Sequence, residues 1–229
     1  MECNPHYHRA RSLRRCHSSR GNATRLSAAV LCGTGSVAVG QTAHGRKYAG
    51  GWGPIYGDGG SGGGIGSDAL RLFLRSLDTP TDLGGLAALF APLTDGLTPE
   101  VFADRMEIKR RALAMSRREF AALAPKIYEL AEGGDLAALS LYEQAATEIV
   151  SLAYAVSEPR ENFKILLCGG FFAQKPLLLQ LCREKLARIS PATPIYEPRF
   201  SPIAAAQLAV LQSDGIPVTD ELFSILLNN

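Results

Sequence analysis

The stretch Ala28-Ala-Val-Leu-Cys-Gly-Thr-Gly-Ser-Val-Ala-Val-Gly-Gln41 decides the fold of this chain. Its first five residues are apolar, which is typical of a short buried strand, and they run into the turn Gly33-Thr-Gly-Ser36. Apolar residues then alternate with others up to Gly45, and a period of two predicts a second strand rather than a helix. We therefore expect a hairpin at the start of the ordered sequence.

Strand patterns and helix patterns alternate along the rest of the chain, which indicates the α/β class. We expect further strands at Phe163–Cys168 and Ile195–Tyr196. Each expected helix begins at a capping residue or a proline. These starts are Ser67, Thr98-Pro99, the capping box Ser116–Glu119, Asp135 with an end near Val156, Pro176 with an end near Ile189, Pro202, and Thr219.

The turn after the first strand formally matches the dinucleotide fingerprint G-x-G-x-x-A, as Gly33-Thr-Gly-Ser-Val-Ala38. That fingerprint requires a helix next and an acid at the end of the second strand, whereas a hairpin follows and the next acid is Asp58. No G-x-x-x-x-G-K-[ST] motif occurs, which excludes a P-loop. The exposed N–H groups of such a turn, with the hydroxyls of Thr34 and Ser36, can hold an anion; a plain hairpin turn is the alternative.

A second glycine-rich segment, Gly50–Gly66, holds ten glycines in seventeen residues together with the only tryptophan, Trp52. Ordering such a loop costs much conformational entropy, which suggests that its backbone meets a ligand. Asp58 is its only charged residue, and a carboxylate beside a tryptophan is a common way to hold a sugar. A flexible linker is the alternative, although linkers rarely carry clustered aromatic residues.

A third glycine pair, Gly169-Gly170, follows the strand expected at Phe163–Cys168. It is compatible with close packing of a nucleotide against the strand end, and equally with a tight turn from strand to helix.

Together these segments resemble the BadF/BadG/BcrA/BcrD ATPase family, in particular its N-acetylglucosamine-kinase-like branch. The segments that carry the resemblance are Gly33-Thr-Gly-Ser36, Gly50-Gly-Trp-Gly-Pro-Ile-Tyr-Gly-Asp-Gly-Gly-Ser-Gly62, Ile165-Leu-Leu-Cys-Gly-Gly170 and Pro202-Ile-Ala-Ala-Ala206. The resemblance implies the C-terminal domain of the actin-like sugar-kinase (ribonuclease H-like) fold, with a mixed sheet flanked by helices. It places this domain at residues 27–215, with a C-terminal helix or tail at 216–229.

The resemblance also implies roles for individual residues. Gly33, Thr34 and Gly35 would bind the phosphates of ATP. Gly169 and Gly170 would lie against the adenosine. The residues that would face the amino sugar are Ser36, Gly51, Trp52 and Asp58. Mg²⁺ would accompany the ATP.

The departures from the family pattern concern catalysis. Family members have an Asp-Gly-Gly-Gly-Thr phosphate loop in an N-terminal domain and a catalytic Asp ahead of the Gly-Thr-Gly-Ser turn. This chain has no such loop, and its only acid before Asp58 is Glu2. Gly59 stands where the family usually has Glu, and Gly62-Gly-Gly64 replaces bulkier residues. We expect the N-terminal domain, the catalytic residue and a protein metal site to be absent from this chain.

The first 26 residues do not match the rest. They are rich in arginine, and three of the four histidines lie there. This segment is compatible with three explanations: a transit peptide, a wrong reading frame or start, or a metal site formed by Cys3, His6, His8, Cys16 and His17. We expect a leader that is disordered or mistranslated.

Composition bounds the remaining possibilities. The 229 residues carry a net charge of +2, with 46% hydrophobic and 20% charged residues, which favours neither nucleic acid nor an anionic membrane as partner. No apolar run is long enough for a membrane span, and the five irregularly spaced cysteines indicate reduced thiols, so we expect a cytoplasmic protein. An apolar face left by the absent domain would predict aggregation or a homodimer.

Three functional hypotheses follow. The first is a fragment of an ATP-dependent kinase for N-acetylglucosamine or a related amino sugar, inactive as written. The second is a non-catalytic module that binds sugar and nucleotide. The third is an activator-type ATPase for acyl-CoA dehydratases or reductases, which needs cysteines that hold an iron–sulfur cluster.

Overall fold

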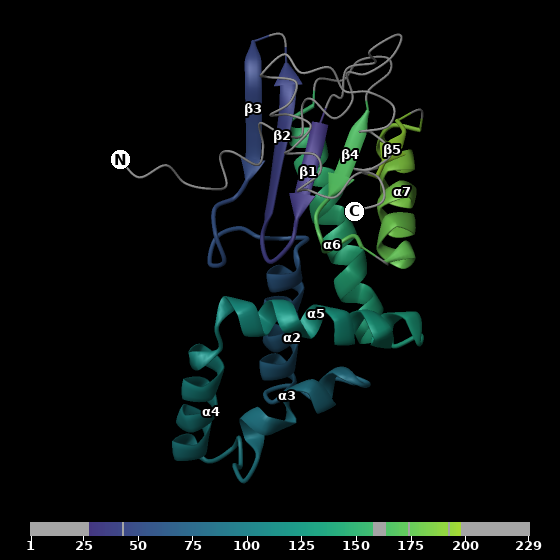
Figure 1. The fold of residues 1–229 in the computed structure, drawn as a ribbon. Coiled ribbons are helices and arrows are strands. Elements are labelled where there is room, and N and C mark those ends of the chain that lie inside the picture. Colours follow the sequence, from purple (N-terminus) through teal and green to yellow (C-terminus); the bar gives the residue numbers. More distant parts are fainter. Residues whose placement is uncertain (1–27, 43, 158–163, 174, 192, 198–229) are drawn as a thin grey trace, which may run out of the picture.

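The computed structural model describes residues 28–42, 44–157, 164–173, 175–191 and 193–197. Their centre is a five-stranded sheet with the strand order β3-β2-β1-β4-β5 (Figure 1). The strands are β1 (Ala28–Cys32), β2 (Ser36–Thr42), β3 (Gly45–Gly50), β4 (Ile165–Cys168) and β5 (Ile195–Tyr196).

The sheet is mixed because its two halves pair in different ways. β1 and β2 form the expected antiparallel hairpin, with Cys32 opposite Ser36. β1 and β4 are parallel, with Leu31 opposite Cys168. The carboxyl ends of β1 and β4 therefore lie at the same edge of the sheet, where Gly33 and Gly169 follow them.

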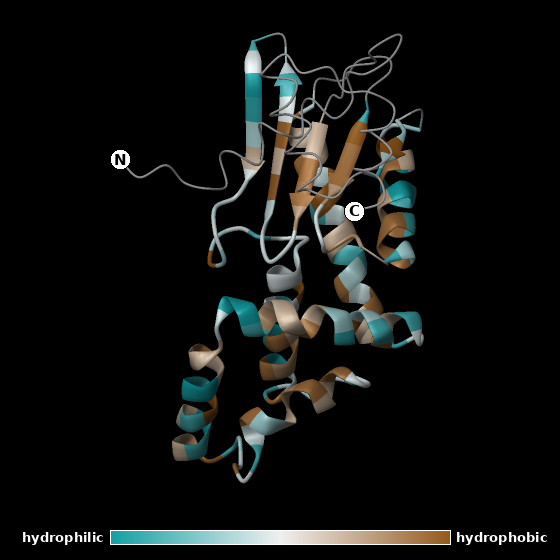
Figure 2. Cartoon of the chain, in the orientation of Figure 1, coloured by the Kyte–Doolittle hydropathy of each residue, from teal (hydrophilic) through white to brown (hydrophobic). Residues whose placement is uncertain are grey.

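The helices form two groups. α2 (Gly62–Ser76), α3 (Leu86–Thr94), α4 (Phe102–Ala114) and α5 (Arg117–Glu132) lie beyond the carboxyl edge of β1 and β4 (Figure 1). α6 (Leu136–Ala155) runs from this helical group along one face of the sheet, where it packs against β1, β2 and α7 (Pro176–Ile189). Hydrophobic residues concentrate on β1 and β4, whereas the edge strand β3 is more polar (Figure 2).

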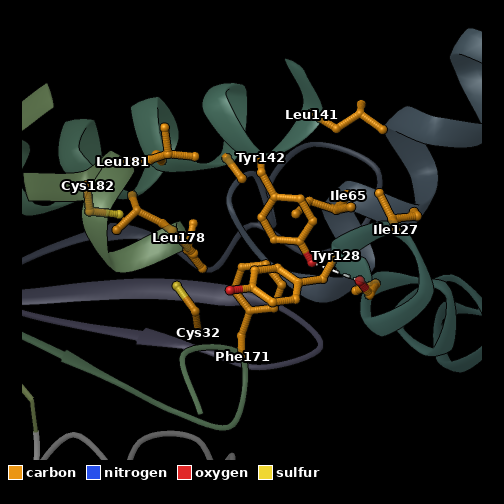
Figure 3. Close-up of a cluster of buried hydrophobic side chains, with 14 of the residues drawn as sticks. Cys32, Ile65, Ile127, Tyr128, Leu141, Tyr142, Phe171, Leu178, Leu181 and Cys182 are labelled. Atoms are coloured by element: carbon orange, nitrogen blue, oxygen red, sulfur yellow. Dashed lines mark hydrogen bonds between the residues drawn. The ribbon is translucent and has the colours of Figure 1, made fainter. Parts of the chain in front are cut away.

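A cluster of buried aromatic side chains joins the two groups of helices to the sheet (Figure 3). Tyr142 of α6 is fully buried, and its hydroxyl donates to the carbonyl of Ala124 in α5 at 2.8 Å. Its ring lies 5.2 Å from that of Tyr128 and 6.1 Å from that of Phe171. The carboxyl edge of β1 and β4 is thus anchored to α5 through packed aromatic rings.

Several expected boundaries are confirmed. The capping box of Ser116 and Glu119 begins α5 and Gly133 ends it, Asp135 caps α6, and α7 begins at Pro176. Within the expected strand 163–168, β4 spans Ile165–Cys168. The helices expected at Pro202 and Thr219, and the leader, lie outside the described residues.

Two expected helix starts are wrong. The helix expected at Ser67 begins at Gly62. The Ser61 side chain caps it, and the N–H groups of Gly62 and Gly63 donate to the carbonyls of Gly33 and Thr34 in the turn after β1. The helix expected at Thr98 begins at Phe102, without a side-chain cap.

Helix α3 is not predicted by the sequence pattern. It follows the pair Gly84-Gly85, contains Pro92 and has no capping side chain. Leu86 and Phe90 bury its inner face in the core instead.

Candidate functional site

The carboxyl edge of β1 and β4 brings two of the predicted ligand-binding segments together. The N–H of Phe171 donates to the carbonyl of Cys32 at 3.3 Å, which ties the loop after β4 to the end of β1. Gly169 has a φ of +112°, and a β-carbon there would overlap the Cys32 carbonyl, so only glycine permits this approach. In open α/β sheets, the crevice at the carboxyl ends of strands is the usual place for a ligand.

The Gly33–Gly35 turn between β1 and β2 leaves N–H groups available to an anion. Gly33 donates to Gly35 O at 2.9 Å and closes the turn, while the carbonyls of Gly33 and Thr34 accept from the first N–H groups of α2. Among the hydrogen bonds of the described residues, none uses the N–H of Thr34 or Gly35, or the hydroxyl of the exposed Thr34. This geometry suits the phosphate-binding role predicted for Gly33, Thr34 and Gly35.

Asp58 lies directly behind this turn. Its side chain is only 5% exposed, and one carboxylate oxygen accepts from Ser36 N at 3.2 Å while the other accepts from Arg117 Nη2 at 2.7 Å. Asp58 has a φ of +64°, the one positive value at a non-glycine residue in the described ranges. Its backbone carbonyl accepts from the N–H of Ser61 at 3.1 Å. The carboxylate is therefore fixed in place at the start of α2.

Arg117 is a site residue that sequence reasoning missed. It is the first residue of α5 and lies 59 positions from Asp58 in the sequence, so no local pattern links them. A β-carbon on Gly35 would overlap both the Arg117 guanidinium and the Asp58 carboxylate, which shows how closely the three residues meet. Only the capping box at Ser116 signals that α5 begins here.

Of the four residues predicted to face a sugar, Ser36 and Asp58 are buried, whereas Gly51 and Trp52 are exposed. Ser36 is buried, and its hydroxyl donates to Gly59 O at 2.7 Å, while its carbonyl accepts from the N–H of Gly51 at 2.9 Å. Trp52 is 77% exposed. The structure thus assembles Ser36, Gly51 and Asp58 into one unit and presents the Trp52 ring to solvent beside it.

The neighbouring apolar side chains of the same loop, Ile55 and Tyr56, are 81% and 85% exposed. The loop therefore offers open apolar surface next to polar groups, as a sugar-binding surface requires.

The two glycines after β4 differ in their surroundings. Gly169 is wedged against β1, whereas Gly170 is exposed, and a β-carbon there would have no atom of the described residues within 4 Å. The ammonium group of Lys175 lies 5.5 Å from the ring centre of Tyr128, and burial lowers the pKa of Lys175. The open surface at Gly170 is compatible with the predicted adenosine contact.

The three cysteines among the described residues are unsuited to a cluster or a nucleophile. Cys32, Cys168 and Cys182 are buried, and burial raises the pKa of Cys32 well above its ordinary value and that of Cys182 to about 12. In the part of the chain that the structure describes, no three His, Cys, Asp or Glu side chains are grouped so as to hold a metal. None of the described helices combines the length and the apolar character that crossing a bilayer requires.

The chain is similar to known proteins over most of its length. Residues 18–212 match the model of the BadF/BadG/BcrA/BcrD ATPase family. The chain is 30% identical over 190 residues to N-acetyl-D-glucosamine kinase of Dictyostelium discoideum, covering 80% of this chain and 59% of that protein. It is 32% identical over 146 residues to N-acetylmuramic acid/N-acetylglucosamine kinase of Clostridium acetobutylicum, covering 62% of this chain and 46% of that protein.

A solved structure shares the fold. It is a protein of Chromobacterium violaceum, provisionally described as an N-acetylglucosamine kinase, with a TM-score of 0.62 at 24% identity, covering 89% of this chain and 63% of that one. The expected α/β class and actin-like sugar-kinase fold are thereby confirmed. The chain spans less than two thirds of the length of each of these proteins.

Proposed function

The chain belongs to the BadF/BadG/BcrA/BcrD ATPase family, and on this premise we propose that it forms the nucleotide- and sugar-binding part of an ATP-dependent amino-sugar kinase. The observation that carries the proposal is the meeting of the Gly33–Gly35 turn, Asp58 and the Gly169-Gly170 loop at one edge of the sheet. N-acetylglucosamine is the proposed substrate because both curated relatives are named as kinases of it.

In this proposal the phosphates of ATP bind at the free N–H groups of Thr34 and Gly35. The adenosine lies on the open backbone at Gly170, where Gly169 brings β4 close enough to β1 to form one surface. Mg²⁺ bound with the nucleotide would offset the negative charge of the phosphates. The described residues include no group of three His, Cys, Asp or Glu side chains that could hold a metal.

The sugar lies against the exposed ring of Trp52, with Asp58 accepting from its hydroxyls. A carboxylate has about four lone-pair sites, so Asp58 can accept from a sugar hydroxyl while it keeps Ser36 N and Arg117. Ser36 and Gly51 act by fixing the loop, because the Ser36 hydroxyl is already bound to Gly59 O.

We further propose that the domain spans 27–215 and that the 229-residue chain binds without transferring phosphate. Its sequence contains no Asp or Glu between Glu2 and Asp58, and Asp58 is held by Arg117. General-base catalysis contributes roughly 10²–10⁴-fold, so phosphate transfer by this chain alone should be very slow. The binding-module hypothesis and the kinase hypothesis therefore make the same prediction for the isolated chain. The activator hypothesis gains no support from the three buried cysteines.

Trp52 provides the test, since it is the only tryptophan of the chain and is exposed. We expect N-acetylglucosamine to change its fluorescence in a saturable manner, and glucose, which lacks the N-acetyl group, to do so less. The variant Asp58→Asn should weaken the sugar response, while Asp68→Asn, at a partly exposed position of α2, should leave it unchanged. Calorimetry should detect Mg·ATP, and a coupled assay should detect no ADP release. Absence of both sugar and nucleotide binding by the folded chain would refute the proposal.

A further inference from the structure

Arg117 is placed where an additional ligand contact is needed. The Gly33–Gly35 turn offers neutral N–H donors, but a polyphosphate carries several negative charges and is held best where a cation assists. The N-terminus of α2 does not supply this charge, since the N–H groups of Gly62 and Gly63 are bound to the carbonyls of Gly33 and Thr34.

The Arg117 guanidinium lies on the same turn. The Gly35 α-carbon is so close to Arg117 Nη2 that a side chain there would overlap it. The arginine side chain is 43% exposed, whereas its partner Asp58 is 5% exposed. A ligand that approaches the turn therefore meets the guanidinium first and the carboxylate only behind it.

The guanidinium is also held in a fixed position. Nη2 donates to Asp58 Oδ2 at 2.7 Å, and this is its one hydrogen bond among the described residues. Arginine carries five N–H donors, so four remain for a ligand. Asp58 is in turn fixed by the N–H of Ser36. The ion pair therefore holds the Arg117 guanidinium in one position before a ligand binds.

The packing of α5 on α2 determines the position of Arg117. A β-carbon on Gly66 of α2 would overlap the Phe120 carbonyl of α5, so the two helices cross in close contact one turn after Arg117. The capping box of Ser116 and Glu119 fixes the first turn of α5, on which Arg117 lies. The position of the guanidinium is thus determined by two rigid helices.

From this geometry we propose that Arg117 is a phosphate-contacting residue of the site, which donates to the phosphate group held by the Gly33–Gly35 turn while Asp58 orients it. The inference rests on the proposed nucleotide-binding function. Arginine suits the task because its planar fork matches phosphate oxygens and keeps its charge at all physiological pH values.

The test compares Mg·ATP with adenosine, which lacks the phosphates, by calorimetry on the full chain. Arg117→Gln should weaken Mg·ATP binding roughly 10- to 100-fold, the range for one charge-assisted hydrogen bond, and leave adenosine binding unchanged. Arg118→Gln is the matched control, because Arg118 is the exposed neighbour on the same helical turn, and it should change neither affinity. Arg117→Lys should give an intermediate loss for Mg·ATP, since lysine retains the charge but not the fork.

Loss of the arginine leaves the Asp58 carboxylate buried without its cation and weakens the fold. The double variant Arg117→Gln with Asp58→Asn removes that buried charge, and it should bind Mg·ATP as weakly as Arg117→Gln alone while it unfolds at a higher temperature.

The outcomes separate the two proposals. If the wild-type chain binds neither Mg·ATP nor adenosine, the nucleotide-binding part of the proposed function fails, and this inference fails with it. If the wild-type chain binds Mg·ATP and Arg117→Gln binds it equally well, the inference alone is wrong. A parallel loss of Mg·ATP and adenosine binding in both Arg117→Gln and the double variant would make the role of Arg117 purely structural and also overturn the inference.

Discussion

Gly169 and Gly170 are adjacent in the sequence, but their surroundings in the structure differ. Gly169 has a positive φ and is packed against the end of β1, whereas a β-carbon on Gly170 would contact none of the described residues. The first residue therefore maintains the shape of the sheet edge, and the second leaves room above it.

Replacement of each by alanine should separate these roles. Gly169→Ala should lower the free energy of unfolding by about 2–4 kcal/mol, because it adds backbone strain and a steric overlap with the Cys32 carbonyl. Gly170→Ala should change it by less than about 0.5 kcal/mol. Urea denaturation measures both, and equal effects would show that the two glycines do not differ as described.

At the scale of elements, the start of α5 depends on one serine. The Ser116 hydroxyl accepts from the N–H of Glu119 at 3.2 Å, and the Glu119 carboxylate accepts from the N–H of Ser116 at 2.7 Å. Ser116→Ala should cost about 1 kcal/mol of unfolding free energy, the usual value of a lost cap. The comparison is Ser67→Ala, which lies inside α2 and should be neutral or slightly stabilising. Thermal or urea unfolding of the two variants tests this, and a larger loss for Ser67→Ala would contradict the observed helix boundary.

The same cap makes the stability of α5 depend on pH. Hydrogen bonds from the Ser116 side chain and backbone lower the pKa of Glu119 below its ordinary value of 4.5. Because the folded pKa is the lower one, the stabilisation is present above pH 4.5 and is lost as the pH falls through the folded value. Glu119→Gln should therefore reduce the difference in unfolding free energy between about pH 6 and about pH 3.5, measured by urea denaturation. An unchanged difference would show that the carboxylate does not act as a cap in solution.

How far the sequence predicts the elements depends on whether their signals are local. The β1–β2 hairpin and the caps of α5 and α6 are encoded in a few neighbouring residues, and the sequence predicts them correctly. It does not predict the start of α2, because a glycine run indicates a loop, and the carbonyls that accept from its N–H groups lie in a distant turn. The site behaves in the same way: its glycine segments are visible in the sequence, whereas the pair of Asp58 and Arg117 exists only after α5 crosses α2.

At the scale of the whole molecule, Tyr142 joins the helical group to the sheet (Figure 3). Its buried hydroxyl donates to the Ala124 carbonyl of α5, and its ring packs on Phe171 of the loop after β4. Tyr142→Phe should lower the free energy of unfolding by about 0.5–1.5 kcal/mol, because it removes the buried hydrogen bond between α6 and α5. Tyr154→Phe, at a 46% exposed position of the same helix, should have little effect. Urea denaturation measures both variants, and equal effects would contradict a stabilising contact between Tyr142 and α5.

The parallel pairing of β1 with β4 has a consequence for how the molecule is made. The Cys168 thiol and the Val30 carbonyl that it contacts lie 138 positions apart, so β1 emerges from the ribosome long before its central partner exists. Contacts between such distant segments form slowly, whereas α2 to α5 can assemble from neighbouring pieces of chain. During refolding we expect amide protection in α2 and α5 to precede protection in β4. The ligand edge, which lies where β1 and β4 end, would then be completed last.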